Sequence, residues 1–181
     1  QSLGGYVAVE YAARRPARVA GLVLSGASAD YRGVLGVTTW VAGLLNRIRA
    51  AIGPLDRRFR EGVRADLEDG PLPPDIVAAV VDGGISLAGY GQGAMALAGP
   101  DFHAKLRSFV GPVLLLNGAA DRLNPDAAET LAPSLPGAET RVISNAGHTC
   151  SIERPDEYTS IICEFATEDV WYPDTKQGDQ K

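Results

Sequence analysis

The amino-acid sequence predicts an α/β protein with three parallel strands in one sheet, flanking helices and a long helical insertion. The first observation behind this prediction is a set of short apolar runs bounded by glycine, proline or polar residues. Such runs are typical of strands that a parallel sheet buries on both faces. The second is that segments with helical spacing separate the runs, as crossover connections between parallel strands require.

The chain opens with a predicted helix and strand. Residues 3–14 have helical spacing, with a stripe of small residues that lets a helix lie close to a sheet, and Pro16 ends the pattern. The apolar run 19–24 then predicts a buried strand. Helix, short turn and strand form the second half of a βαβ unit, so we expect the first strand of that unit upstream of Gln1.

Residues 27–108 lack the pattern of buried strands and are predicted to form a helical insertion. The segment 40–52 is amphipathic, with basic residues on one side. A breaker at 70–74 precedes another helical pattern, for which Asp75 could be the N-cap. Arginines gather at 57–64 and could bind an anion, but their alternation with acids favours a solvated helix face.

The strand pattern resumes after the insertion, at 113–117 and again at 141–144. Between these strands, 125–131 is predicted to form a short helix with Asn124 as its N-cap. The segment 155–166 has the spacing of a last amphipathic helix. The predicted parts of the chain are a first core segment, the insertion, a second core segment and a polar tail: 1–26, 27–108, 109–166 and 167–181.

Composition and charge limit the classes of partner. The 181 residues are 45% hydrophobic and 22% charged, as in an ordinary globular domain with a sizeable core. The net charge of -5 argues against a broad surface for nucleic acid or anionic membranes, and no apolar run approaches the length of a membrane span. We expect a cytoplasmic protein, with a signal peptide upstream of Gln1 as the open alternative.

Cysteine and histidine usage predicts neither a disulfide framework nor a metal site. Cys150 and Cys163 lack metal-type spacing, and the chain has only 2 histidines. Cys163 lies in an apolar helical pattern, so we expect it to be buried. Cys150 follows His148 closely, and packing is the expected role, with a reactive thiol as the alternative. Nothing in the sequence implies an organic cofactor.

Three polar residues follow predicted strands and carry the prediction of function. The opening residues Gln1-Ser2-Leu3-Gly4-Gly5 match the second half of the motif Gly-x-Ser-x-Gly, in which a sharp turn after a strand exposes the serine hydroxyl. Asp121 and His148 each come just after a later strand. Functional residues of an open α/β sheet gather at the carboxyl ends of its strands, so we expect these three to meet.

Acyl transfer requires these residue types. A serine hydroxyl is a poor nucleophile until an imidazole accepts its proton, and a carboxylate fixes the tautomer of that imidazole. We therefore predict Ser2 as nucleophile, His148 as general base and then acid, and Asp121 as the acid that orients it. The backbone N–H of Leu3 is the predicted donor to the oxyanion, and the chain order Ser, Asp, His is that of α/β-hydrolase sheets.

The sequence resembles the carboxyl-terminal part of an α/β-hydrolase fold protein, from Gln1 to about residue 166. The stretch 118–121 with Pro125 resembles the acid loop of that superfamily, and 146–148 with Glu153-Arg154-Pro155 resembles its histidine loop and the following helix. The resemblance implies a serine hydrolase with a helical cap, acting on a small-molecule ester or similar acyl compound. It also implies a second oxyanion donor in a loop upstream of this chain.

Alternative roles for the same residues stay open. Asp121 could simply cap a loop, because aspartate is common in glycine-rich turns for backbone reasons. Asp126 and Glu153 are the other candidate acids, but neither follows a strand directly. Ser25 and Ser28 lie near a strand end without the pair of glycines that the serine turn requires.

Other activities stay open as well. The same triad would serve carbon–carbon bond hydrolysis, perhydrolysis or acyl transfer. A non-catalytic hydrolase-like protein or a truncated remnant is the alternative from another class. In the insertion, five apolar residues could line an acyl or leaving-group pocket or form the core of the insertion itself: Trp40, Leu44, Leu45, Tyr90 and Met95. The sequence does not indicate an oligomeric state.

Overall fold

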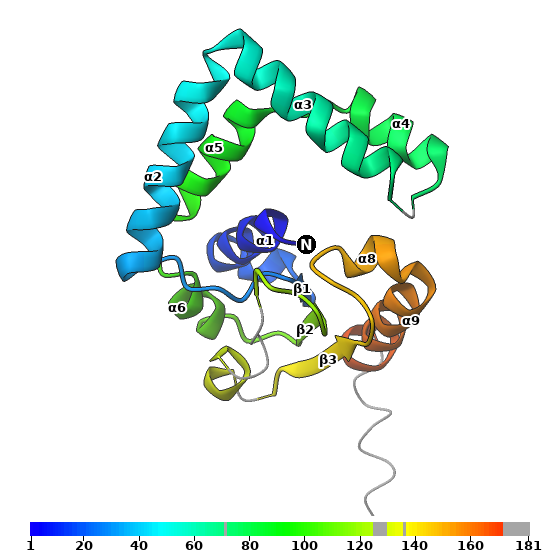
Figure 1. Ribbon diagram of the computed structural model, residues 1–181. Helices are drawn as coiled ribbons and strands as arrows, with labels where there is room; N and C mark the ends of the chain where they lie inside the picture. Colours follow the sequence, from blue (N-terminus) through cyan, green and yellow to red (C-terminus); the bar gives the residue numbers. More distant parts are fainter. Residues whose placement is uncertain (71, 125–129, 136, 172–181) are drawn as a thin grey trace, which may run out of the picture. The chain divides into compact units, whose positions relative to one another are not determined.

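The computed structural model describes residues 1–70, 72–124, 130–135 and 137–171 of the chain. These residues form two compact units. The sheet unit, as we call it, consists of Gln1–Ala29 and the described residues from Asp101 onward, and the helical unit is Asp30–Pro100 (Figure 1). The helical unit is therefore a single insertion into the sheet unit.

The predicted insertion 27–108 is too wide at both ends, because 27–29 and 101–108 belong to the sheet unit. Helix α6 (Phe102–Arg107) lies in that unit and buries Leu106 in its core. Since α6 has only 6 residues, it is too short to show helical spacing clearly in the sequence.

Three strands form the sheet: β1 (Leu22–Ser25), β2 (Val113–Gly118) and β3 (Glu139–Ile143). β2 lies in the middle and pairs in parallel with both neighbours. The predicted sheet of three parallel strands is confirmed among the residues that the structure describes.

Two strands begin at other residues than predicted. The run 19–24 becomes strand only at Leu22, because a 3-10 turn at Pro16–Arg18 precedes it and the Val19 N–H still donates to the Pro16 carbonyl of that turn. β3 begins before residue 141 because it is an edge strand, where Glu139 and Arg141 form an ion pair instead of continuing the apolar run.

Two helices of the sheet unit follow the predicted spacing, α1 (Leu3–Arg14) and α9 (Pro155–Phe165), and the two short helices α6 and α8 (Cys150–Glu153) are additions to the prediction. A 3-10 turn at Ala132–Ser134 precedes β3. Of the short helix expected over 125–131, residues 125–129 lie outside the described residues.

Two predictions about the last helix need correction. A π-helical segment continues α9 from Ala166 to Trp171, so helical backbone covers the beginning of the predicted tail 167–181. Cys163 is exposed rather than buried. The side of α9 that packs on the core is taken by larger residues, among them Ile162 and Phe165, and Cys163 lies beside this stripe.

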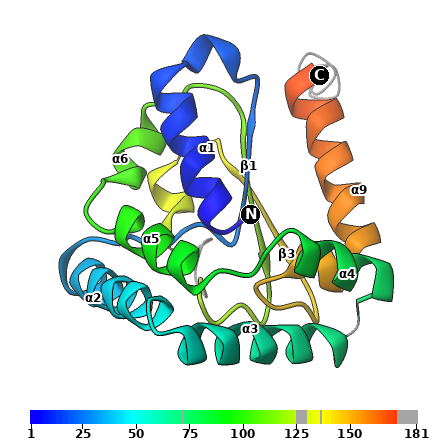
Figure 2. The same cartoon turned by 90° about the horizontal axis from the view of Figure 1, so that it is seen from above.

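β2 is buried along its whole length, and its side chains alternate between two apolar layers. Val113 and Leu115 belong to a layer with α1 and α6. Leu114 and Leu116 belong to the opposite layer, with β3, α8 and α9. Figure 2 shows α1 and α6 on one side of the strands and α9 on the other. Burial on both faces explains why residues 113–116 of β2 are continuously apolar.

The helical unit contains no strand among its described residues. Its helices are α2 (Gly33–Ala50), α3 (Gly53–Glu68), α4 (Pro74–Asp82) and α5 (Leu87–Leu97). α2 and α5 pack along each other, and the Tyr31 carbonyl accepts a hydrogen bond of 3.1 Å from the Gly99 N–H beside them. Along α3, Arg60 pairs with Asp56 and Arg64 pairs with Glu68, each one helical turn away. These ion pairs support a solvated helix face rather than an anion site.

A hollow of about 450 Å³ lies at one end of this unit. Its lining is mainly apolar and includes Tyr31, Gly36, Val37, Trp40 and Ala98. Trp40 thus lines a pocket, whereas Tyr90 is largely exposed and packs edge-on against Phe59. No helix in the described part of the chain is long and apolar enough to cross a lipid bilayer.

Candidate active site

Ser2 lies in a strained turn directly before α1. Its backbone has φ 49° and ψ -129°, a combination that residues other than glycine rarely adopt. The turn is fixed to the sheet because the Ser2 N–H donates to the Ser25 carbonyl at the end of β1, at 2.8 Å. Gly5 allows this close approach, since a Cβ there would lie 2.5 Å from the Cβ of Ala27. Such strain persists only where the surroundings impose it, and it clusters at functional sites.

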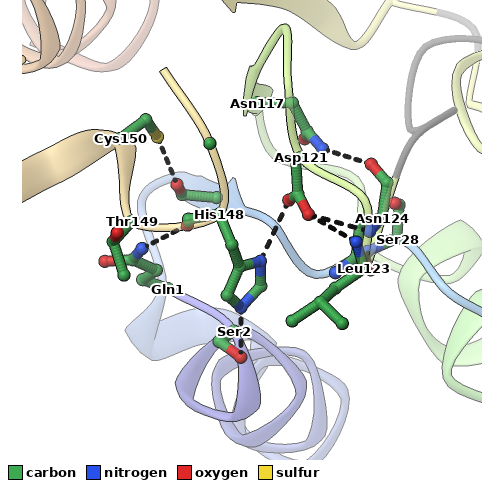
Figure 3. Close-up of polar contacts among 12 residues, drawn as sticks. Gln1, Ser2, Ser28, Asn117, Asp121, Leu123, Asn124, His148, Thr149 and Cys150 are labelled. Atoms are coloured by element: carbon green, nitrogen blue, oxygen red, sulfur yellow. Dashed lines mark hydrogen bonds and ion pairs between the residues drawn. The ribbon is translucent and has the colours of Figure 1, made fainter. Parts of the chain in front are cut away.

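The structure brings the three predicted residues together. His148 Nε2 lies 3.0 Å from Ser2 Oγ, and His148 Nδ1 lies 3.0 Å from Asp121 Oδ2 (Figure 3). An ionised carboxylate can only accept, so the proton belongs on Nδ1 and Nε2 is left to accept the serine hydroxyl. All three side chains come from the sheet unit.

Asp121 is buried, with 1% of its side chain exposed. Its Oδ2 faces His148, and its Oδ1 accepts the backbone N–H groups of Leu123 and Asn124 at 2.8 and 3.0 Å. Burial is the largest single influence on the Asp121 pKa and raises it, but the hydrogen bonds from His148, Asn124 and Leu123 outweigh burial. The pKa therefore lies below the ordinary value, and Asp121 is ionised at neutral pH.

Two asparagines fix the acid loop, and sequence analysis missed this role. Asn117, at the end of β2, donates from Nδ2 to the Asn124 carbonyl at 2.8 Å. Asn124 Oδ1 accepts the N–H groups of Ser28 and Ala29 at 3.2 and 3.1 Å, so this side chain binds the backbone of the segment that follows β1. A polar residue inside an otherwise apolar strand was the one available signal for Asn117.

The histidine loop is tied at its backbone by Glu153 and Gln1. Glu153 accepts the Gly147 N–H and the Thr149 hydroxyl, each at 2.8 Å. These bonds, the one from Gly147 first, hold the pKa of Glu153 below its ordinary value. The Gln1 amide donates to the His148 carbonyl at 2.7 Å, which Figure 3 shows beside the imidazole.

Comparison with known proteins decides the family. A model of the alpha/beta hydrolase family matches residues 1–161. The chain belongs to the alpha/beta hydrolase family. The pimeloyl-[acyl-carrier protein] methyl ester esterase of Aromatoleum aromaticum is 31% identical over 177 residues, which cover 89% of this chain and 70% of that protein. A putative 2-succinyl-6-hydroxy-2,4-cyclohexadiene-1-carboxylate synthase of Bacillus subtilis is 25% identical over 185 residues, covering 92% of this chain and 64% of that protein.

Solved structures agree with this family fold. A thermophilic esterase from Thermogutta terrifontis has a TM-score of 0.70 and 23% identity, covering 93% of this chain and 63% of that one. MenH from S. aureus has a TM-score of 0.68 and 22% identity, covering 93% of this chain and 66% of that one. At these identities the likeness shows the fold alone. The chain spans 64% to 70% of the length of the two curated relatives above.

In this alpha/beta hydrolase, the alternative acids and serines do not contact the imidazole within the described residues. Glu153 binds loop backbone, and Asp126 lies outside the described residues. Ser25 is buried and its Oγ lies 3.5 Å from the sulfur of Cys150, itself buried, which fits a packing role for this cysteine. The Ser28 carbonyl contacts His103 Nε2 at 2.8 Å.

The predicted oxyanion donor, Leu3, lies beside the predicted nucleophile, Ser2. Leu3 is the first residue of α1, and its N–H makes no hydrogen bond within the described residues. Backbone N–H groups at a helix N-terminus carry partial positive charge, which suits a developing oxyanion. Within the part of the chain that the structure describes, no group of three or more His, Cys, Asp or Glu side chains could hold a metal ion.

Gly26 lies directly against the His148–Asp121 pair and gives a first prediction. Its φ is +56°, and a Cβ there would lie 3.0 Å from His148 Nδ1 and 3.2 Å from Asp121 Oδ2. Gly26→Ala should therefore push the ring out of line, with kcat for an ester falling on the order of tenfold or more. The positive φ should add a stability loss of about 1–2 kcal/mol, measured by chemical unfolding.

Gly84→Ala is the matched control for this prediction. Gly84 also has a positive φ, +92°, but a Cβ there meets nothing within 4 Å. Gly84→Ala should thus lose stability and keep kcat. Equal kcat values for the two variants would show that the space beside the imidazole does not limit turnover.

Proposed function

We propose that this chain carries the catalytic triad of a serine esterase. The observation that supports the proposal is the unbroken line from Ser2 Oγ through the His148 imidazole to Asp121, built around a strained serine. A merely structural network would not need the serine in a rare backbone conformation, whereas a nucleophile must project from its turn.

Each residue then has one role in a two-step reaction. Ser2 Oγ attacks the ester carbonyl carbon as its proton passes to His148 Nε2, and Asp121 stabilises the imidazolium. The Leu3 N–H donates to the oxyanion of the tetrahedral intermediate. Collapse breaks the bond to the alkoxy group, which leaves as the alcohol with the proton from His148. Water then attacks the acyl-Ser2 ester with His148 again as base, releasing the acid and the free serine.

The substrate class that we propose is a carboxylic ester with a small alcohol. The Aromatoleum aromaticum relative is named a methyl ester esterase, and its match covers most of this chain. The direct test uses a fluorophosphonate, which should label Ser2 covalently, and a panel of methyl and ethyl esters of increasing acyl length. Labelling of another residue in place of Ser2, or no turnover of any ester, would contradict the proposal.

A second candidate keeps the three residues and changes the reaction. The Bacillus subtilis relative is named a putative synthase and not an esterase, and it matches over a similar share of this chain. Chemistry without an acyl-enzyme would give no burst of alcohol from an activated ester in rapid-mixing experiments. An esterase should give a burst of about one alcohol per Ser2 whenever deacylation is the slower step.

The pocket in the helical unit supports a prediction on acyl selectivity. Trp40 lines it and is 42% exposed, so its removal should cost little packing in that unit. Trp40→Ala should therefore change kcat/KM for long acyl chains severalfold relative to short ones, while the unfolding temperature changes little. Ile48→Ala, on the same helix and outside the pocket, is the control. Loss of stability with unaltered selectivity would assign Trp40 to packing.

A further inference from the structure

Two side chains hold three successive residues of the histidine loop, Gly147 and His148 by their backbone and Thr149 by its hydroxyl. Glu153 accepts from the Gly147 N–H with Oε2 and from the Thr149 hydroxyl with Oε1. Between them, the His148 carbonyl accepts from Gln1 Nε2. We call Gln1 and Glu153 together the loop clamp.

The loop needs such support because regular structure does not provide it. Residues 144–149 lie between β3 and α8 in turns, and Asn145 has a positive φ of 54°. The imidazole must nevertheless meet two partners on different elements, Ser2 before α1 and Asp121 after β2, each at 3.0 Å. Reaction rates fall steeply when reacting groups are misplaced by even 1 Å.

Gln1 connects Ser2 to the histidine loop, because it precedes Ser2 in the chain and its side chain binds the His148 carbonyl. A carbonyl oxygen only accepts hydrogen bonds, so the NH₂ end of the Gln1 amide must face the His148 carbonyl. The other end then accepts the Ser151 hydroxyl, at 2.6 Å. Both ends of the amide are thus engaged, and the chemical identity of each end is fixed by its partner.

We propose that Gln1 and Glu153 are positioning residues that set the distance between Ser2 Oγ and the imidazole of His148. The proposal rests on the proposed function, since it assigns the clamp a role in the same reaction. Neither side chain contacts the three reacting groups through its own polar atoms, so the effect acts through the loop backbone. The rival interpretation is that both merely close an exposed loop and leave the chemistry unaffected.

Two isosteric substitutions, Gln1→Glu and Glu153→Gln, distinguish the positioning role from mere closure of the loop. Gln1→Glu places an oxygen without a proton against the His148 carbonyl, so the bond becomes a repulsion, and we expect kcat to fall on the order of tenfold or more. Glu153→Gln should be tolerated, because its oxygen can accept the Gly147 N–H while its NH₂ donates to the Thr149 hydroxyl, which also accepts. Glu153→Ala loses both hydrogen bonds, so its kcat should fall as far as that of Gln1→Glu.

Two further variants remove the effect of charge alone. Gln1→Leu breaks the same bonds as Gln1→Glu without an added charge and should lower kcat in the same direction. Gln92→Glu makes the same chemical change on an exposed part of α5 and should keep the wild-type kcat. If kcat falls in Gln1→Glu but not in Gln1→Leu, the added charge alone explains the loss, and the proposed positioning role is overturned.

The measurements are kcat, KM and the unfolding temperature, together with the imidazole NMR signals. With only 2 histidines in the chain, the His103 signal serves as an internal reference for that of His148. We expect lower kcat with little change in KM, and loss of the hydrogen-bonded Nδ1 proton of His148 in Gln1→Glu and Glu153→Ala. Wild-type kcat in both, or a Glu153→Gln variant as impaired as Glu153→Ala, would overturn the proposal.

The test of the loop clamp can fail or succeed independently of the test of the esterase proposal. If the wild-type protein hydrolyses no ester and Ser2 takes no fluorophosphonate, the esterase proposal fails while the NMR comparison still decides the clamp. An unchanged His148 Nδ1 proton in Gln1→Glu and Glu153→Ala would then refute the clamp on its own. If the wild type is active and the variants keep its kcat, the clamp fails and the esterase stands.

Discussion

Ser2→Ala is expected to lower ester turnover by about four orders of magnitude or more, and His148→Ala should do the same. The double variant should be hardly worse than either single one. The reason lies in the 3.0 Å contact between Ser2 Oγ and His148 Nε2. Loss of either residue stops the same proton transfer, so loss of the second lowers the rate little further.

The measurement is kcat/KM for the best ester of the panel, with burst kinetics to titrate active sites. Ser160→Ala, on an exposed position of α9, is the control for loss of a serine hydroxyl and should keep full activity. Additive losses in the double variant would mean that Ser2 and His148 do not act as one unit. Turnover that survives in Ser2→Ala would remove Ser2 from the reaction altogether.

The sheet could be predicted from the sequence because parallel strands are buried on both faces. β2 is the clearest case, as its residues 113–116 supply both apolar layers and are therefore apolar without interruption. β3 was predicted less well, since Glu139 and Arg141 pair at the edge of the sheet and hide the start of the strand. Strand ends thus depend on neighbours that the local sequence does not specify.

The candidate site could be predicted because its residues share a place in the topology. Ser2, Asp121 and His148 each lie at the carboxyl end of a strand or before a helix, which is a local property of the sequence. The clamp has no such local property. Gln1 binds the His148 carbonyl across 147 positions of sequence, and nothing in its neighbourhood distinguishes it from any exposed glutamine.

The roles of Asn124 and Glu153 could not be predicted from the sequence either, because they too depend on contacts that the neighbouring sequence does not indicate. The sequence predicts Asn124 only as a helix cap, whereas the structure shows its side chain bound to the backbone of Ser28 and Ala29, almost a hundred residues earlier. In the sequence, Glu153 is an alternative acid and part of the stretch that resembles the histidine loop and following helix, and neither interpretation indicates which groups it binds. The structure instead gives it the two groups that flank His148 in the loop.

Asp121→Asn should reduce kcat on the order of 10⁴-fold while leaving the fold intact. The geometry of the acid loop determines this result. The Leu123 and Asn124 N–H groups both point at Oδ1, so the variant must place its amide oxygen there. Its NH₂ then faces His148 Nδ1, which has to accept, and the ring proton moves to Nε2. A protonated Nε2 cannot take the proton of Ser2 Oγ.

Nitrogen chemical shifts of His148 should therefore report the opposite tautomer in Asp121→Asn, in a variant that is still folded at neutral pH. Because the pKa of Asp121 is depressed below its ordinary value of 3.8, ionisation of the wild-type carboxylate stabilises the fold fully above that value. That contribution is lost as pH falls through the folded pKa, so the wild type should lose stability there by more than Asp121→Asn does.

Asp75→Asn, at an exposed position in the first turn of α4, is the control and should leave turnover and tautomer unchanged. If Asp121→Asn retains turnover within about tenfold of the wild type, the acid that orients His148 is not Asp121. If turnover is lost while Nδ1 keeps its proton, the loss has a cause other than the tautomer. Only loss of turnover together with the proton on Nε2 supports the orientation of His148 by Asp121.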